Sequence, residues 1–433
     1  MKLDKLNYFL ETKFIPIANK IGGNKYLQSV RDGLLMSMPF IMIGSIFLIL
    51  TNLPIPGYSN VMENIFGEKW KMYFSIPSRG TFDILALFAS ISIAYNLAKR
   101  YEIDSLSTAI TSFACFIIST PLSIFKDDVL VSDKALVFDF TSSKGLFVAI
   151  VVSILVTEIC NFFIKRNWVI KMPDSVPAAA ARSFNALIPS GAAIIIIWAI
   201  RYILSVTPFD NLHNIINFVL GKPISLLGQS LIGILIGLII QQLLWSVGLH
   251  GSSILLAVLR PPFMMLLDQN RMAFEAGQPL PNIINLSFYE LWIQFGGSGT
   301  TLGLVFSLLL FVKSKQLKNL GKLAIIPSLF NINEPVSFGI PIIMNPIMFI
   351  PWIVAPLVSA TVTYFAMSFG LVAKATGVLI PWTTPCFISG TLATNSISGG
   401  ILQIILIVIT GAIYYPFIRA WDKQKLMEEQ AKM

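Results

Sequence analysis

A single carboxylate, Glu334, stands between long apolar runs in the stretch LFNINEPVSFGIPIIMNP (329–346). Asn331 and Asn333 precede it, and Pro335 follows it. A carboxylate at membrane depth costs about 3 kcal/mol or more, so it marks a functional site unless it caps the backbone of a hairpin. Amide side chains both donate and accept hydrogen bonds, so the two asparagines suit a polyhydroxyl ligand better than an ion.

His250 is the second candidate for chemistry, in the stretch QQLLWSVGLHGSSILL (241–256). A lone histidine is often only a packing residue, and Gly248 and Gly251 would let a helix break beside it. Its neighbours favour a site, because they add aromatic, amide and hydroxyl groups: Trp245, Gln241, Gln242, Ser252 and Ser253.

Two further clusters have the same polar character. The segment WIQFGGSGTTLGL (292–304) brings bare backbone and hydroxyls into an apolar run through Gly297, Ser298, Gly299 and Thr300. Close helix packing is the alternative for these glycines. Trp382, in LIPWTTPC (379–386), belongs either to an interfacial aromatic belt or to a face that stacks on a sugar ring, and Trp245 has the same two readings.

These residues do not form the sites of several other protein classes. A cation-coupled transporter would show more intramembrane carboxylates, a channel would show a filter motif, and no GxxxxGK[ST] nucleotide motif is present. Asp83, Arg201 and Arg260 lie near span ends or can snorkel, whereas Glu158 and Glu290 have no such explanation.

Cysteine usage argues against metals and disulfides. Cys115, Cys160 and Cys386 lie far apart inside apolar segments, and the chain has only two histidines. We therefore expect no metal, no cofactor and no disulfide.

Composition sets the class of protein that positions these residues. The chain has 433 residues, of which 55% are hydrophobic and 12% are charged. A soluble protein would carry roughly twice that charged fraction. The long apolar runs predict an all-α polytopic membrane protein, because a β-barrel would show short alternating segments. The net charge of +9 follows from basic loops and gives no reason to expect nucleic acid.

About ten transmembrane helices are predicted, preceded by a helix at 1–22 that lies on the membrane surface. The predicted spans are 33–50, 81–98, 105–125, 145–164, 184–206, 225–248, 250–267, 287–312, 343–372 and 398–418. Alternation of these spans collects the lysine-rich loops on one side, so both termini are expected in the cytoplasm. The aspartate-rich loop 126–144 falls on the other side.

Two segments rich in proline and polar residues, 323–341 and 376–396, do not read as crossings. Non-helical backbone is tolerated at membrane depth only where it is buried in protein or lines a water-filled cavity. Each segment is therefore predicted to be a re-entrant hairpin. The expected organisation is a five-helix dimerisation and scaffold half at 1–206, an interfacial amphipathic connection at 207–224, a substrate-binding half at 225–420 and a cytoplasmic tail at 421–433.

Three stretches resemble a known family. NINEPVSFGIPIIMNPIMFIPWIVAPLV (331–358) closely resembles the signature of enzyme IIC, the membrane component of the bacterial phosphoenolpyruvate-dependent phosphotransferase system. WSVGLHGSSI (245–254) and PWTTPCFISG (381–390) are similar to its lactose/cellobiose/diacetylchitobiose branch, and most of all to diacetylchitobiose permeases. The resemblance covers essentially the whole chain.

The resemblance implies a homodimeric permease of the bacterial cell membrane, surrounded by lipid, with ten spans and two re-entrant hairpins. It implies that a disaccharide binds at the bilayer midplane and that phospho-enzyme IIB phosphorylates its 6-hydroxyl during import. The chain would therefore contribute to a phosphotransferase reaction only together with enzyme IIB. No cysteine here has the context of a phosphoryl donor, so enzyme IIB is expected to be a separate protein.

The resemblance also assigns roles. It places Glu334 and His250 near the 6-hydroxyl, with Glu334 holding or deprotonating it and His250 as partner or alternative base. Asn331 and Asn333 would orient the sugar or the hairpin, and Trp245 and Trp382 would offer ring faces. The alternative function is a proton-coupled oligosaccharide symporter in which Glu334 carries the proton, and a third possibility is a sugar sensor without transport.

Overall fold

The computed structural model describes residues 20, 23–53, 55, 57–126, 129–132, 135–173, 175–216, 218–219, 229–246, 248–339 and 346–430. The predicted surface helix at 1–22 lies almost entirely outside these residues. The same holds for 220–224 of the predicted connection and for the last three residues of the predicted tail.

The chain divides into two compact units. The N-terminal unit comprises Gly22–Phe47 and Lys71–Ser225, and the C-terminal unit comprises Met1–Ile21, Leu48–Trp70 and Leu226–Met433. The predicted assignment of dimerisation to one half and of sugar binding to the other stays a prediction.

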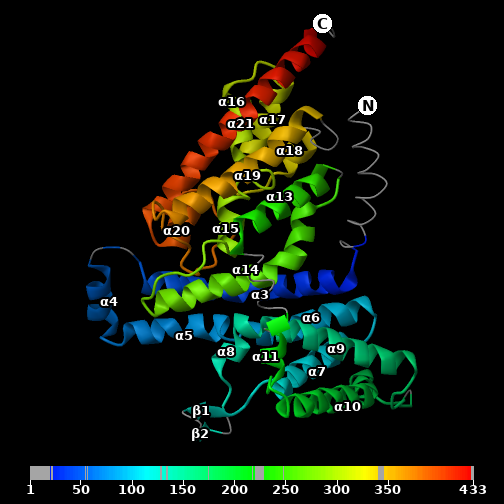
Figure 1. Cartoon of the computed structure of the whole chain (residues 1–433). Coiled ribbons are helices and arrows are strands. Elements are labelled where there is room, and N and C mark those ends of the chain that lie inside the picture. Colours follow the sequence, from blue (N-terminus) through cyan, green and yellow to red (C-terminus); the bar gives the residue numbers. More distant parts are fainter. Residues whose placement is uncertain are drawn as a thin grey trace. The chain divides into compact units, whose positions relative to one another are not determined.

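The N-terminal unit is built mainly from helices. Its elements are most of α3 (Lys25–Thr51), most of α5 (Trp70–Phe82), α6 (Leu85–Arg100), α7 (Ser105–Ser119), β1 (Ile124–Lys126), β2 (Val129–Ser132), α8 (Phe138–Thr141), the 3-10 turn η2 (Ser143–Gly145), α9 (Leu146–Lys165), α10 (Ala178–Ser205) and α11 (Leu212–Ile216). Helices α6, α7 and α9 pack against one another (Figure 1). The hydroxyls of Ser112 on α7 and Ser153 on α9 both donate to the carbonyl of Ser90 on α6, at 2.8 and 3.1 Å. Small hydroxyl residues thus let three helices approach closely while satisfying their own polar groups.

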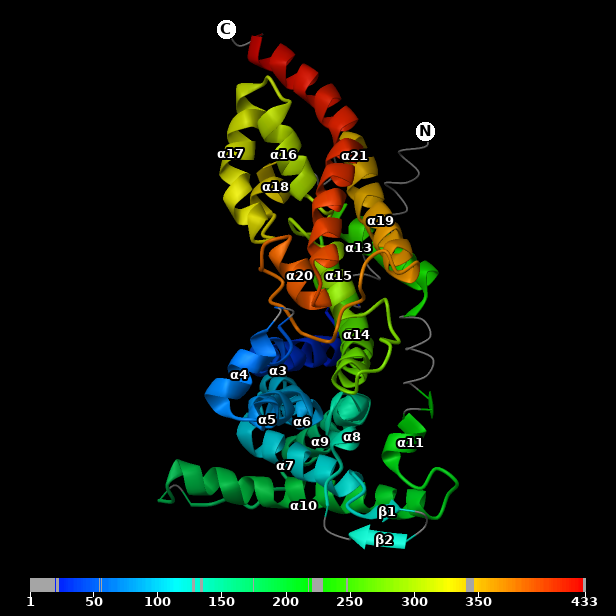
Figure 2. The same ribbon diagram turned by 90° about the vertical axis from the view of Figure 1, so that its left-hand side faces the viewer.

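The C-terminal unit carries the predicted site. Its elements are α4 (Tyr58–Phe66), α13 (Leu231–Ser246), α14 (Gly251–Glu275), α15 (Leu286–Trp292), α16 (Leu302–Leu310), α17 (Lys315–Leu329), α18 (Glu334–Gly339), α19 (Pro346–Ser368), α20 (Ile388–Thr394) and α21 (Ile397–Gln430). The long helix α21 packs along α16, α19 and α20 (Figures 1 and 2). Side chains cap several of these helices, as Asn285 does for α15 by accepting from the Phe288 N–H at 3.0 Å.

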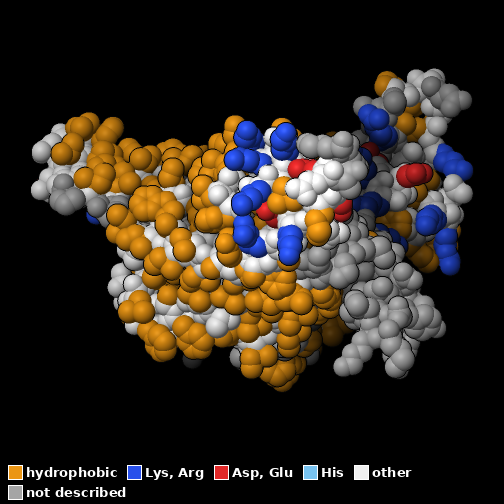
Figure 3. Space-filling model, turned by 90° about the horizontal axis from the view of Figure 1, so that it is seen from above, with side chains coloured by type: hydrophobic (Ala, Val, Ile, Leu, Met, Phe, Trp, Pro, Cys, Tyr) orange, Lys and Arg blue, Asp and Glu red, His pale blue; other side chains and the backbone are white. Residues whose placement is uncertain are grey.

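The predicted all-helical membrane class is confirmed. Within the described part of the chain, seven helical segments are long and apolar enough to cross a membrane: 25–51, 70–100, 143–165, 180–205, 251–275, 348–368 and 397–430. Helices α7 and α13 are apolar but shorter. Hydrophobic side chains cover much of the face seen in Figure 3, and lysine and arginine side chains gather near its middle and at its right-hand end. The count of ten crossings and the sides of the two termini stay predictions.

The predicted span at 287–312 is wrong as a continuous helix. Helix α15 ends at Trp292 and α16 begins at Leu302. Between them Gly296, Gly297 and Gly299 have φ of 69°, 93° and 83°. A right-handed helix cannot pass through such residues, so the glycine-rich sequence forms a tight irregular turn (the glycine turn, 293–301).

Both predicted hairpin segments contain a break in helical structure, although Pro327 of the first lies within α17. In the first, α17 ends at Leu329, Asn331 adopts φ 63°, and α18 begins at Glu334. In the second, chain without regular secondary structure, with turns at 382–384 and 386–387, leads to α20, which starts at Ile388. That these segments enter and leave on one side of a membrane stays a prediction.

The aspartate-rich loop contains a feature that helical periodicity could not reveal. Strands β1 and β2 pair in antiparallel fashion, with Lys126 opposite Val129. This two-stranded hairpin is a local element of the loop between α7 and α9, so it leaves the helical class unchanged.

Two carboxylates of α21 tie the start of α17 to the C-terminal helix. Buried Asp422 accepts from the backbone N–H groups of Lys313 and Ser314, at 3.0 and 2.8 Å. Glu429 accepts from the Ser314 hydroxyl at 2.7 Å and from the N–H of Gln316 at 3.0 Å. Because the first N–H groups of a helix lack partners within the helix, these contacts stabilise both elements.

Asp422→Asn should therefore weaken this junction. The substitution keeps the side-chain size but replaces charge-assisted hydrogen bonds with a neutral amide, and we expect a loss of about 1 to 3 kcal/mol in the free energy of unfolding. Thermal unfolding of the purified protein measures it. The exposed neighbour Lys423, changed to Gln, is the matched control and should unfold like the wild type. Equal stability of all three proteins would contradict this role of Asp422.

Candidate functional site

The predicted site residues near 298 and 333 meet in the C-terminal unit. The Asn333 amide donates to the carbonyl of Ser298 at 2.6 Å. Gly297 lies directly against the same asparagine, since a Cβ added there would stand 2.4 Å from Asn333 Cγ. The glycine turn and the tip of the α17–α18 segment are therefore in direct contact.

Asn331 joins three segments through one amide group. Its Oδ1 accepts from the backbone N–H of Gly296 at 2.7 Å, and its Nδ2 donates to the carbonyls of Trp382 and Thr384. The side chain is buried. These contacts support the hairpin-orienting role among the two considered for Asn331, and direct contact with a sugar stays a prediction.

Ser298 is the meeting point of α13, α14 and the glycine turn. Its Oγ accepts from Gln241 Nε2 at 3.1 Å and from the Ser252 hydroxyl at 3.4 Å, and it donates to Gln242 Oε1 at 3.4 Å. The Gln241 Oε1 in turn accepts from the Tyr289 hydroxyl at 2.5 Å. A buried hydrogen-bond network thus extends from α15 to the candidate site.

Aromatic rings lie beside this network. Trp245 stands 4.5 Å from His250 between ring centroids and 6.4 Å from Trp352, and its Nε1 donates to Ser252 at 3.3 Å. Trp352 packs on Gly299, because a Cβ there would come within 2.4 Å of the indole ring. Apolar ring faces next to amides and hydroxyls match the two kinds of surface on a pyranose.

His250 caps the helix that it precedes. Its Nδ1 accepts from the backbone N–H of Ser253 at 3.2 Å and lies 2.9 Å from the Ser253 hydroxyl, while the ring is exposed. A nitrogen that accepts a backbone N–H carries no proton, so neutral His250 holds its proton on Nε2.

The remaining predicted residues lie in the same unit. Glu334 is the first residue of α18, directly after Asn333, and its side chain lies outside the described part of the structure. Trp382 is 47% exposed, and its carbonyl accepts from Asn331. Thr300 is fully buried and donates to the Ile293 carbonyl at 3.0 Å, so its hydroxyl stabilises the glycine turn.

Several residues of the site carried little signal in the sequence. Tyr289, Trp352 and Tyr414 look like ordinary members of apolar helices, yet the Tyr414 hydroxyl donates to the Gly299 carbonyl at 2.6 Å. Arg260 does not snorkel: it is buried and forms an ion pair with Glu290 at 3.0 Å. The one sequence signal for this part of the site was the pair of adjacent glutamines, Gln241 and Gln242, inside an apolar run.

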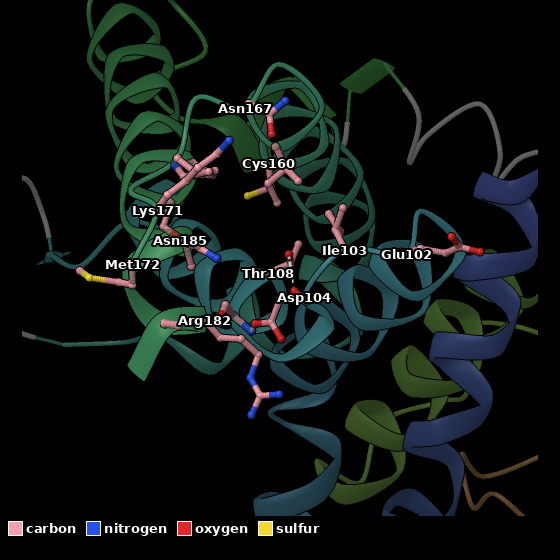
Figure 4. A pocket seen from close by; sticks show the side chains of 17 residues that line it. Glu102, Ile103, Asp104, Thr108, Cys160, Asn167, Lys171, Met172, Arg182 and Asn185 are labelled. Atoms are coloured by element: carbon pink, nitrogen blue, oxygen red, sulfur yellow. Dashed lines mark hydrogen bonds between the residues drawn. The ribbon is translucent and has the colours of Figure 1, made fainter. Parts of the chain in front are cut away.

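A separate cavity lies in the N-terminal unit. Its volume is about 480 Å³, and residues of α7, α9, α10 and the connecting loop line it, among them Asp104, Cys160 and Lys171 (Figure 4). Its lining falls within 102–190, so the candidate site at 245–382 is elsewhere.

Comparisons of this chain with known proteins all find members of one family. The family model described as "Phosphotransferase system, EIIC" matches residues 31–356. The cellobiose-specific EIIC component of Geobacillus stearothermophilus is 48% identical, over 99% of this chain and 97% of that protein. The lichenan permease IIC component of Bacillus subtilis (strain 168) is 47% identical, over 99% and 96%.

A solved structure is similar over nearly its full length. It is the crystal structure of the transporter ChbC, the IIC component from the N,N'-diacetylchitobiose-specific phosphotransferase system. The TM-score is 0.95 and the identity is 45%, covering 98% of this chain and 99% of that one.

Gly297→Ala should disrupt the contact between the glycine turn and the hairpin tip. At φ 93° a side chain is strained, and the new methyl group would overlap Asn333. We expect a loss of about 2 kcal/mol or more in the free energy of unfolding. Thermal unfolding of the purified protein measures this loss. Gly80→Ala is the control, since nothing lies within 4 Å of its added Cβ. A Gly297→Ala protein as stable as that control would contradict the tight contact.

Proposed function

The chain belongs to the EIIC family of the phosphotransferase system, and we propose that it is a permease that brings a disaccharide of the cellobiose or diacetylchitobiose type into the cytoplasm. The family and its apolar helices make it a multi-pass bacterial membrane protein. The single observation that carries the proposal is the contact of Asn333, the residue before Glu334, with the Gly297–Ser298 turn. This contact brings the start of α18, where Glu334 stands in the sequence, to a cluster of amides, hydroxyls and indole rings.

Transport is coupled to phosphorylation in this proposal. The sugar 6-hydroxyl oxygen attacks the phosphorus of a phosphocysteine on enzyme IIB, the new O–P bond forms, and the P–S bond breaks to release a thiolate. The hydroxyl proton passes to the Glu334 carboxylate. The added charge then keeps the product inside, so no ion gradient is needed.

The cap at the start of α14 supports a division of roles between the two candidate bases. Nδ1 of His250 accepts the Ser253 N–H, so the neutral ring offers a donor at Nε2. A donor holds the 6-hydroxyl oxygen, whereas the carboxylate of Glu334 accepts its proton. We therefore assign the base to Glu334 and the orienting hydrogen bond to His250. Trp245 and Trp382 provide ring faces, and Asn331, Asn333, Gly297, Ser298, Gly299 and Thr300 form or shape the pocket.

Enzyme IIB is proposed to be a separate protein, and the permease a homodimer embedded in lipid. The first point is supported by relatives named as IIC components, which align over 96 to 97% of their own length. The second is supported by α10, where Ile195, Trp198 and Tyr202 are each more than half exposed within the chain. Such a helix face needs lipid or a second copy against it.

Glu334→Gln should bind the disaccharide with near wild-type affinity but lose phosphorylation by at least a hundredfold, since proton acceptance contributes about 10² to 10⁴ to such reactions. Calorimetry measures binding, and transfer of labelled phosphate from enzyme IIB measures the reaction. Glu63→Gln, on the exposed face of α4, is the control. Normal phosphorylation by Glu334→Gln would remove the proposed base.

Uptake into vesicles separates the permease from the proton symporter. With phospho-enzyme IIB inside and no gradient, we expect phosphorylated cellobiose or diacetylchitobiose to accumulate. With a proton gradient alone, we expect no accumulation. Unmodified sugar concentrated by the gradient would establish the symporter, and binding without any uptake would establish a sensor. Competition between labelled diacetylchitobiose, cellobiose and lactose then identifies the preferred substrate.

A further inference from the structure

Several buried hydrogen-bond donors beside the glycine turn have no acceptor. In the described part of the structure, Gln242 Nε2, Trp352 Nε1 and Ser337 Oγ are buried without a partner. Each adjoins the site: Gln242 bonds to Ser298, Trp352 packs on Gly299, and the Ser337 N–H donates to the Asn333 carbonyl. Leaving a buried donor without a partner costs about 1 to 3 kcal/mol, so such groups call for an explanation.

Gln242 is the most informative of these residues because its neighbour Gln241 has hydrogen-bond partners for both its amide oxygen and its amide nitrogen. Both glutamines have no exposed surface. Gln241 uses its oxygen with Tyr289 and its nitrogen with Ser298. Gln242 uses only its oxygen, which accepts from the Ser298 hydroxyl.

The orientation of the Gln242 amide follows from the same network. Ser298 Oγ already accepts from Gln241 and from Ser252, so its two lone pairs are occupied. Its proton needs an acceptor, and Gln242 Oε1 is the acceptor in place. Exchanging the nitrogen and oxygen of Gln242 would turn that proton toward Ser252 Oγ and would leave the buried Gln242 amide oxygen without a donor, so the orientation that the structure has keeps the Ser298 proton on Gln242. The Nε2 donor therefore faces away from Ser298.

The groups around Gln242 indicate which kind of ligand atom accepts a hydrogen bond from its Nε2. Trp245 lies on the same helix three residues later, and the Trp352 ring is at its edge. Amide and indole N–H donors beside apolar ring faces match the neutral oxygens and the C–H faces of a sugar ring.

We propose that Gln242 is a substrate-binding residue whose Nε2 donates a hydrogen bond to one oxygen of the bound disaccharide. This inference rests on the proposed function. The Gln242 oxygen accepts from the Ser298 hydroxyl, and the Gln242 nitrogen donates to the sugar. Neither group takes part in the proton transfer assigned to Glu334. It therefore contributes to the affinity for the sugar and leaves the rate of phosphoryl transfer at saturating sugar unchanged.

The test compares Gln242→Met with the wild type in the full-length protein. The probes are cellobiose and diacetylchitobiose, whichever the wild type binds more tightly, and the monodeoxy analogues of that sugar. In the wild type, removal of one particular oxygen should weaken binding roughly tenfold, the factor that corresponds to about 1.4 kcal/mol. In Gln242→Met the parent sugar should bind roughly tenfold more weakly, and removal of that same oxygen should cost nothing further.

Two further variants make the result specific. Gln242→Asn keeps the amide but shortens the side chain, so it should also lose the coupling to that oxygen, and it carries the test if the Met variant does not fold. Tyr289→Phe disturbs the network at Gln241 and should weaken every analogue by the same factor. Gln424→Met, on the exposed end of α21, should bind like the wild type.

Several outcomes would overturn the proposal. These are unchanged affinity in both Gln242 variants, equal weakening across all analogues, or a fall in the saturated phosphorylation rate with unchanged affinity. A wild-type protein that binds neither disaccharide would instead overturn the proposed function. Coupling of Gln242 to a single oxygen, with normal turnover at saturation, would establish the residue as a sugar ligand.

Discussion

A helix that breaks inside a bilayer must find partners for its freed N–H and C=O groups within the protein, because lipid supplies none. The C-terminal unit meets this constraint with side-chain amides and hydroxyls. Asn331 satisfies Gly296 and two carbonyls of the 376–396 segment, Asn333 satisfies Ser298, and Tyr414 satisfies Gly299. A polar cluster follows from this requirement, since the side chains that bond to the freed backbone groups must lie where the helix is broken.

These side-chain hydrogen bonds to the backbone also determine how rigid the site is. Fully used amides have one orientation and little freedom, so the glycine turn and the hairpin tip hold each other in place. Buried Gln403 contributes in the same way, since its oxygen accepts from the N–H groups of Phe387 and Gly390 while its nitrogen donates to the Leu291 carbonyl. Side chains that bind a neutral sugar need this kind of support, because each hydrogen bond contributes only about 1 kcal/mol and is lost by small displacements.

The membrane class and the approximate position of the site could be predicted because they depend on residue types that are costly in an apolar chain. Glu334, His250 and the paired asparagines stood out for that reason. The interruption at 293–301 was missed as a break because its flanks, Trp292 and Leu302, continue the hydropathy of a span, and hydropathy does not reveal the positive φ angles of the glycines and of Thr300 between them. Trp352 and Tyr289 could not be identified, since an aromatic residue in an apolar helix has the same pattern whether it meets lipid or a pocket. The pairing of Arg260 with Glu290 joins two helices over 30 positions, which is beyond any local pattern.

The use of the Asn331 amide has a consequence for how this motif is read. An aspartate of the same shape could not donate to two carbonyls, and a leucine could neither donate nor accept, so asparagine is required by the architecture whichever sugar is carried. The asparagine that makes the sequence recognisable is therefore explained by its contacts within the protein. Substitutions that change the substrate are expected at positions where a side chain has a hydrogen-bonding group without a partner in the protein. The contacts that hold the scaffold together can stay unchanged while those positions vary.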